Sequence, residues 1–245
     1  MLAAWAASPA RFREDANAEE DLALGAYRDR VVVELAQNAA DAAARAGVPG
    51  RLLLRLDPPA KDGAEAGESH GALVAANTGA PLDAAGVEAL STLRASAKRE
   101  VSGAAAVAVG RFGVGFAAVL ALSDDLSMCS RSGGVRWSRS GAGDLAGELP
   151  TLAAELARRS GGGSVLRLPF PAPELTGGTF VDGNDYDTVV RLPLRSAAAR
   201  ALAARLLAEV DAALLLALPA LVEVTVDVAG DIRTLRAARA RPTGT

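Results

Sequence analysis

Apolar and polar residues follow two different periods along the chain, and these periods predict where helices and strands lie. Residues 27–45 are rich in Ala, Val and Leu and contain no Pro or Gly. The sequence Gly47-Val48-Pro49-Gly50 follows, so the pattern predicts one helix that ends there. Residues 51–57 and 73–76 are short apolar runs typical of strands, and residues 82–93 predict a second helix.

Short strands predominate in the second half of the chain. Gly133-Gly134 predicts a hairpin turn, and a second hairpin is expected around Gly230-Asp231. A helix is expected over residues 196–218, ahead of this second hairpin. The strands expected in this half are residues 126–130, 135–138, 165–168, 188–192, 222–228 and 232–235.

The order of these elements predicts the fold class. Helices come mostly first and strands mostly later, whereas a doubly wound parallel sheet would alternate strand and helix regularly. We therefore expect an α+β fold, a two-layer α/β sandwich in which helices cover one face of a mixed, largely antiparallel sheet.

Composition excludes several classes of protein. The 245 residues carry a formal net charge of −3, which gives no sign of a basic surface, so no nucleic-acid partner is expected. The most apolar later stretch, residues 212–218, is far shorter than the ~20 residues of a membrane span, so no membrane partner is expected either. Cys129 is the single cysteine, which excludes an internal disulfide and agrees with a cytoplasmic location.

Three polar residues share one face of the helix predicted at 27–45. At about 100° per residue, Asn38 lies roughly 40° from Glu34, and Asp41 lies roughly 20° from Glu34 on the other side. This face can be an ordinary solvated surface, with Asp41 paired to Arg45 one turn later. Alternatively, Glu34 is a general base that activates water and Asn38 gives a carbonyl oxygen to Mg²⁺.

Two further segments have both an ordinary and a functional interpretation. Residues 110–115 hold three glycines ahead of a helical stretch, and such a turn is either a simple turn or a phosphate-binding loop. Residues 110–115 form neither a Walker A loop nor a dinucleotide fingerprint. Asn77-Thr78-Gly79 follows a short strand, so Asn77 either belongs to a turn or accepts a hydrogen bond from an adenine amine.

These segments together resemble the GHKL superfamily of ATPases, which includes DNA gyrase, the ninety-kilodalton heat-shock chaperones, histidine kinases and MutL. Residues 34–42, 77–79 and 110–116 are similar to its N box and its two glycine boxes, in the family's order. The two phenylalanines of the last box and Gln37 resemble the chaperone and sacsin-like branch. Residues 187–195 resemble the late strand whose Thr binds adenine, and the resemblance covers roughly residues 25–195.

The resemblance implies a Bergerat fold that binds ATP with Mg²⁺, with Glu34 as the catalytic base and Asn38 as the metal ligand. Residues 92–98 resemble the mobile lid, in which Lys98 would contact phosphate. The residues implied to bind nucleotide are Asn38, Asp41, Asn77, Gly79, Lys98, Gly110, Arg111, Phe112, Gly113, Val114, Gly115, Phe116 and Thr188.

Two positions depart from the family pattern. The adenine-reading residue is usually Asp, whereas here it is Asn77, a neutral acceptor that makes a weaker hydrogen bond than a carboxylate. Ala80-Pro81 stands where the family has Ile-Gly, at the start of the lid.

The implied function is a chaperone-like ATPase in which nucleotide closes a lid. The alternative is a module that binds nucleotide without hydrolysing it and presents the ordered lid to an unidentified protein partner. A DNA-processing ATPase is disfavoured because the chain has no basic surface signal.

Domain organisation follows from the same resemblance. Residues 1–195 are expected to form the ATP-binding domain. Residues 196–245 would be a helix and hairpin that begin a following domain, or that meet a second copy of the chain. Because no arginine after 195 is marked as a donor to the phosphates, turnover by the isolated chain is expected to be slow.

Overall fold

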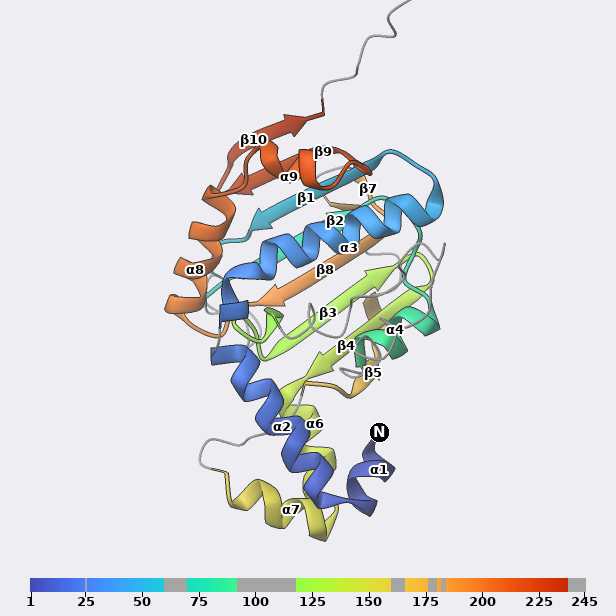
Figure 1. The fold of residues 1–245 in the computed structure, drawn as a ribbon, viewed down its shortest axis with the longest axis vertical. Helices are drawn as coiled ribbons and strands as arrows, with labels where there is room; N and C mark the ends of the chain where they lie inside the picture. The colour runs from blue at the N-terminus through green and yellow to red at the C-terminus, as the bar shows by residue number, and fades with distance from the viewer. Residues whose placement is uncertain are drawn as a thin grey trace, which may run out of the picture.

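A mixed sheet of eight strands forms the centre of the computed structural model (Figure 1). The structure describes residues 1–24, 26–59, 70–91, 118–159, 166–175, 180–181 and 184–237. The strand order is β10-β9-β1-β2-β8-β3-β4-β5, and β1 runs parallel to β9 while the other neighbours are antiparallel. The strands of this sheet are β1 (Gly50–Leu56), β2 (Ala72–Asn77), β3 (Asp125–Ser130), β4 (Gly133–Ser138), β5 (Pro169–Pro171), β8 (Thr188–Pro193), β9 (Leu221–Val228) and β10 (Asp231–Arg236).

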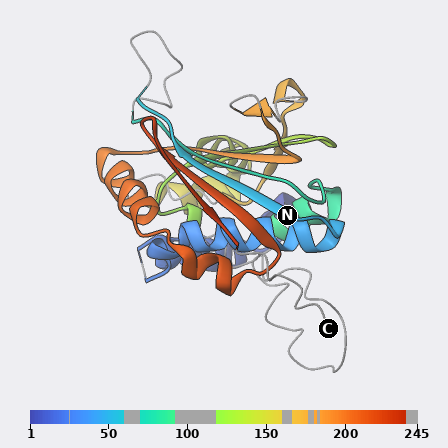
Figure 2. The ribbon, with the colours of Figure 1, turned by 90° about the horizontal axis from the view of Figure 1, so that it is seen from above.

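Helices cover one face of this sheet, with α3, α8 and α9 on the same side in Figure 2. A separate two-stranded ribbon, β6 (Phe180–Val181) and β7 (Asn184–Asp185), lies on the opposite side. The described helices are α1 (Leu2–Ala7), α2 (Pro9–Leu24), α3 (Val31–Ala46), α4 (Ala84–Ser91), α6 (Arg139–Gly147), α7 (Pro150–Ala157), α8 (Ala197–Ala208) and α9 (Ala212–Ala217), with short 3-10 turns at Ala26–Arg30 and Pro173–Leu175. The predicted α+β class, a two-layer sandwich with a mixed and mostly antiparallel sheet, is confirmed.

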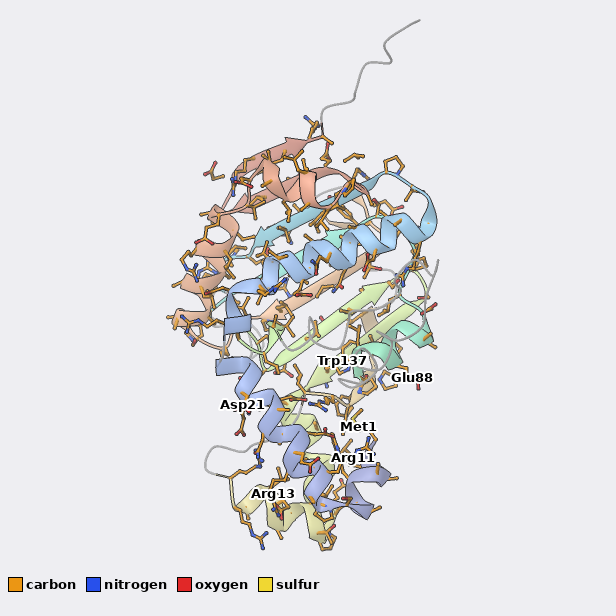
Figure 3. The ribbon with its side chains drawn as sticks, viewed as in Figure 1. Met1, Arg11, Arg13, Asp21, Glu88 and Trp137 are labelled. Atoms are coloured by element: carbon orange, nitrogen blue, oxygen red, sulfur yellow. The ribbon has the colours of Figure 1, made fainter. Side chains whose placement is uncertain are left out.

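The main hydrophobic core lies between α3, α8 and the sheet. Alternate residues of β1, Leu52, Leu54 and Leu56, point into it, while Leu53 packs on the opposite face against Tyr186. Trp137 of β4 is fully buried in this core, and its indole N–H donates to the Ser91 hydroxyl at the end of α4 (3.2 Å; Figure 3). This core fixes α3 against the strands that carry the predicted site residues.

A second, smaller core belongs to a helical unit built from α1, α2, α6 and α7, at the foot of Figure 1. Trp5 and Phe12 are fully buried in it and pack edge to face, with ring centroids 5.3 Å apart. The indole of Trp5 donates to Asp15 (2.9 Å), and Arg167 pairs with both Asp15 (3.0 Å) and Glu19. These ion pairs join α2 to the segment that precedes β5. Among the described residues, no helix combines the length and apolar character needed to cross a membrane.

Three secondary-structure predictions are wrong. Residues 166–168 are not a strand, since Arg167 turns into the helical unit and β5 begins at Pro169. The hairpin turn lies at Arg131 and Ser132, while Gly133 and Gly134 both belong to β4. A Cβ on Gly134 would lie 2.3 Å from the carbonyl oxygen of Ala172, so this glycine permits close packing rather than a turn.

The third is the helix expected at 196–218, which is two helices, α8 and α9. Asp211 begins the second one by accepting a hydrogen bond from the Ala213 amide (2.9 Å). Arg233 donates to the carbonyls of Leu207, Ala208 and Val210 around the break.

The predicted hairpin around Gly230-Asp231 is confirmed. Its strands β9 and β10 extend the same sheet that holds β1 and β2.

Candidate functional site

A cleft between α3, α4 and the sheet brings together predicted residues from three separate elements. It contains about 640 Å³ of empty space, part of it open to solvent. Asn38 of α3, Asn77 of β2 and Thr188 of β8 all line it. The other lining residues are Leu35, Ala42, Arg45, Ala75, Ala80, Leu82, Asp83, Gly86, Leu90, Met128 and Val190.

Strand register places Asn77 beside Thr188. The two residues are directly opposite in the antiparallel pair of β2 and β8, so their side chains share one face of the sheet. Both are buried, at 8% exposure each. The side-chain nitrogen of Asn77 donates to the Thr78 carbonyl (3.3 Å), which leaves the side-chain oxygen as the acceptor.

The turn after Asn77 is pressed against α3. Gly79 has φ of +138°, and a Cβ there would lie 2.5 Å from the carbonyl carbon of Ala42. Only glycine fits this backbone conformation and this approach. The Ala80 amide donates to the Ala42 carbonyl (2.9 Å), which ties the turn to the helix that carries Asn38.

The polar face of α3 continues from the cleft into a smaller cavity. Glu34 lines this cavity together with Asn38, and Leu35, Asn38, Leu90, Met128 and Val190 line both spaces. The Glu34 side chain is 14% exposed and lies 3.7 Å from the guanidinium of Arg30. Glu34 and Asn38 are therefore only partly exposed and line hollows between α3 and the sheet.

Asp41 differs from its two neighbours because it lines neither space. It is partly buried, and burial raises the pKa of its carboxyl, while the positive charge of Arg45 acts in the opposite direction. The predicted i,i+4 pairing of Asp41 with Arg45 stays a prediction, and so does the predicted role of Asp41 in binding nucleotide.

Sequence reasoning missed two residues that lie outside the cleft and support the segments that line it. Ser130 is fully buried, accepts a hydrogen bond from the Leu82 amide (3.0 Å) and lies 3.4 Å from the Thr188 hydroxyl. Asp187 accepts a hydrogen bond from the Gly79 amide (2.8 Å). Their contacts depend on the pairing of β3 with β8 and of β8 with β2, which no local pattern reveals. The one available signal is that Asp187 directly precedes Thr188.

The phosphate end of the predicted site lies outside the described residues. This holds for Lys98, for the expected lid at 92–98 and for the whole glycine-rich segment at 110–116. Within the described part of the chain, no three His, Cys, Asp or Glu side chains are grouped as a metal cage. A Mg²⁺ ion bound with a nucleotide takes only one or two protein ligands, so the Asn38 amide oxygen fits that donor set.

Comparison with known proteins adds no assignment. The chain matches no protein-family model, and no curated protein is significantly similar to it. The three motifs and the cleft are therefore the observations from which its function is inferred.

Proposed function

We propose that the chain binds ATP in the cleft between α3 and the sheet and hydrolyses it slowly with Mg²⁺, as a chaperone-like ATPase of the GHKL type. The observation that carries this proposal is the meeting of Asn38, Asn77 and Thr188 in one cleft. They come from the N box, the first glycine box and the late strand, which are far apart in sequence. We also propose a cytoplasmic location, with which the single cysteine agrees.

The cleft suits an adenine base at its inner end. Apolar side chains of Leu35, Met128 and Val190 supply flat contact for a ring, while Asn77 and Thr188 supply polar groups at the edge. The side-chain oxygen of Asn77 would accept a hydrogen bond from the exocyclic amine of adenine. Guanine has a carbonyl at that position, so the same oxygen disfavours it.

Hydrolysis would take place where the cleft joins the smaller cavity. The Asn38 amide oxygen would hold Mg²⁺, which neutralises phosphate charge when it is bound. Glu34 lies one helical turn before Asn38, about 6 Å away, and takes a proton from the attacking water. The exposed Arg30 guanidinium lies 3.7 Å from the Glu34 carboxylate and places a positive charge beside it.

The test measures binding and ADP release with labelled ATP and Mg²⁺. Glu34→Ala should bind ATP like the parent chain and hydrolyse it about 10²–10⁴-fold more slowly, because a general base has been removed. Asn38→Ala should weaken binding of Mg·ATP much more than binding of adenosine, because only the phosphates need the metal. Glu148→Ala, which removes an exposed carboxylate at the end of α6, is the matched control.

The first outcome separates the two functional classes, and the other two test the roles of Glu34 and Asn38. If the parent binds ATP and releases no ADP, the chain is the non-hydrolysing module. Parent-like hydrolysis by Glu34→Ala would show that Glu34 is not the base. Equal losses for Mg·ATP and adenosine in Asn38→Ala would assign Asn38 to the fold rather than to the metal.

A further inference from the structure

One carboxylate outside the cleft binds the turn that carries the adenine-reading residue. Asp187 lies between β7 and β8, and one of its carboxylate oxygens accepts from the Gly79 amide (2.8 Å). The backbone amide of Asp187 donates to the Asn77 carbonyl (2.9 Å). The side chain and backbone of one residue thus hold both ends of the Asn77–Gly79 turn.

A second element fixes this carboxylate. Arg131, in the hairpin turn between β3 and β4, donates from Nε to the other carboxylate oxygen of Asp187 (2.6 Å). Its backbone amide also donates to the Asp187 carbonyl (3.3 Å), and the buried Ser130 hydroxyl donates to the same carbonyl (3.1 Å). A further arm of the Arg131 guanidinium pairs with Asp185. Asp187 therefore sits in a fixed position set by β3, β8 and their turns.

The turn benefits from such a restraint because ordering its glycine costs conformational freedom. Gly79 adopts φ of +138°, and glycine loses more conformational freedom on ordering than any other residue. Without the Asp187 carboxylate, the turn keeps the Ala80 contact to α3 and loses the charge-assisted hydrogen bond to Gly79. Ala80, the next residue, lines the cleft together with Asn77, so motion of Gly79 changes the cleft wall beside the proposed base acceptor.

We propose that Asp187 is a positioning residue for base recognition: held by Arg131, it fixes the turn at Gly79 and so the cleft wall beside Asn77, where an adenine edge would lie. It acts through Gly79 and Asn77 and touches no ligand itself. This inference rests on the proposed ATP function, because it assigns the base end of that same cleft.

The experiment compares Asp187→Ala, Asp187→Asn and Arg131→Ala with the parent chain. Asp227→Ala is the matched control, because Asp227 also accepts from a glycine amide in a turn (Gly230, 2.9 Å) but lies at the far edge of the sheet. Calorimetry gives the affinities for adenosine and for Mg·ATP. Hydrogen exchange of the 78–80 amides in the ligand-free protein reports the turn directly. Steady-state kinetics separates KM from kcat.

Asp187→Ala should lower the affinities for adenosine and for Mg·ATP by the same factor, about tenfold. This is the loss expected for one charge-assisted hydrogen bond. KM should rise while kcat at saturating ATP stays at the parent value, and the Gly79 amide should exchange faster. Asp187→Asn keeps an acceptor for Gly79 and should recover part of the affinity. Arg131→Ala should lower the affinities for both ligands by a smaller factor.

Two failures are distinguishable. If the parent binds neither adenosine nor ATP, the proposed function is wrong and the base-positioning role falls with it, whatever the exchange of Gly79 shows. If the parent binds ATP but Asp187→Ala keeps parent affinity and parent exchange at Gly79, the positioning role is overturned while the ATP function stands. An equal loss of adenosine affinity in Asp227→Ala would also overturn it.

Discussion

At the scale of single residues, the most informative one is Asn77. A carboxylate at this position would be buried at the end of β2, close to the turn that Asp187 already binds. The neutral amide avoids a second negative charge there and uses its nitrogen to satisfy the Thr78 carbonyl. In the proposed site, Asn77 would be a base-reading acceptor that is weaker and less costly to bury than a carboxylate.

Asn77→Asp should bind adenine nucleotides more tightly without admitting guanine. A charged acceptor adds about 1 kcal/mol to one hydrogen bond, which corresponds to about fivefold in affinity. The ligand-free variant should melt at a lower temperature, because a charge is buried without its partner. Calorimetry with ATP and GTP, and a thermal melt without ligand, check both parts. A variant that bound GTP as well as ATP would place Asn77 away from the base.

The candidate site could be predicted only where its residues follow from a local motif. Glu34, Asn38 and Asn77 each stand in a short recognisable segment, and Thr188 lies in a strand of similar sequence. Asp187 and Ser130 could not be predicted in this way, because their contacts arise from strand pairing between distant segments.

At the scale of elements, the strands were predicted better than the helices. β1, β2, β8, β9 and β10 all lie within one or two residues of their predicted bounds, because each is a continuous or alternating apolar run bounded by turn residues. Helices α1, α2, α6 and α7 were not predicted. They pack mainly on one another around a small core, so their stability depends on contacts that local periodicity does not encode.

Helix α6 shows most clearly why these helices could not be predicted from local sequence. Its sequence contains Gly141 and Gly143, which disfavour a helix. The Ser138 side chain caps it by accepting from the Gly141 amide (3.2 Å). A Cβ on Gly141 would lie 3.3 Å from the ring of Phe170, so this glycine allows the helix to pack closely on β5. Tertiary packing therefore overrides the local preference.

Helices α2 and α7 are joined by an ion pair that should make the helical unit sensitive to acid. Arg13 of α2 (Figure 3) donates from two nitrogens to the Glu155 carboxylate (2.9 and 2.6 Å). These hydrogen bonds lower the pKa of Glu155 in the folded chain. Its contribution to stability is therefore present above the unfolded pKa of about 4.3 and is lost as the pH falls through the lower, folded pKa.

The test compares urea unfolding of the parent with that of Glu155→Gln, followed by the fluorescence of Trp5 in chains that also carry Trp137→Phe. Glu155→Gln should be less stable than the parent at pH 7, because Arg13 loses its charged partner. The difference should shrink as the pH falls from about 5 to about 3 and the parent carboxylate is protonated. A difference that is the same at pH 7 and pH 3 would contradict the assignment.

At the scale of the whole molecule, the C-terminal elements complete the sheet that holds the cleft. β9 pairs with β1 along its whole length, from Gly50 opposite Leu221 to Leu56 opposite Val228. The main core includes residues from α8, the following loop, α9 and β9, namely Ala199, Ala203, Leu206, Leu207, Val210, Leu215, Leu221, Val224 and Val226. Residues 196–236 therefore share a core with the segment that carries the motifs.

A chain ended after Arg195 should fail to fold. It would expose the edge of β1 and uncover Leu52 and Leu54, and an exposed apolar edge strand promotes aggregation. A chain ended after residue 237 keeps every described element and serves as the control. Size-exclusion chromatography and thermal melting check the outcome. A monomeric, cooperatively melting 1–195 chain would show that the division at 195 is a true domain boundary.

The parallel pairing of β1 with β9 also affects how the protein is made on the ribosome. β1 leaves the exit tunnel long before β9 is synthesised, and during that interval its leucines have no partner strand on one side. The helical unit has a shorter wait, since its partners α6 and α7 are synthesised well before β9. We expect the nascent chain to close its small helical core first. The growing chain would need protection by a cellular chaperone until the sheet is complete.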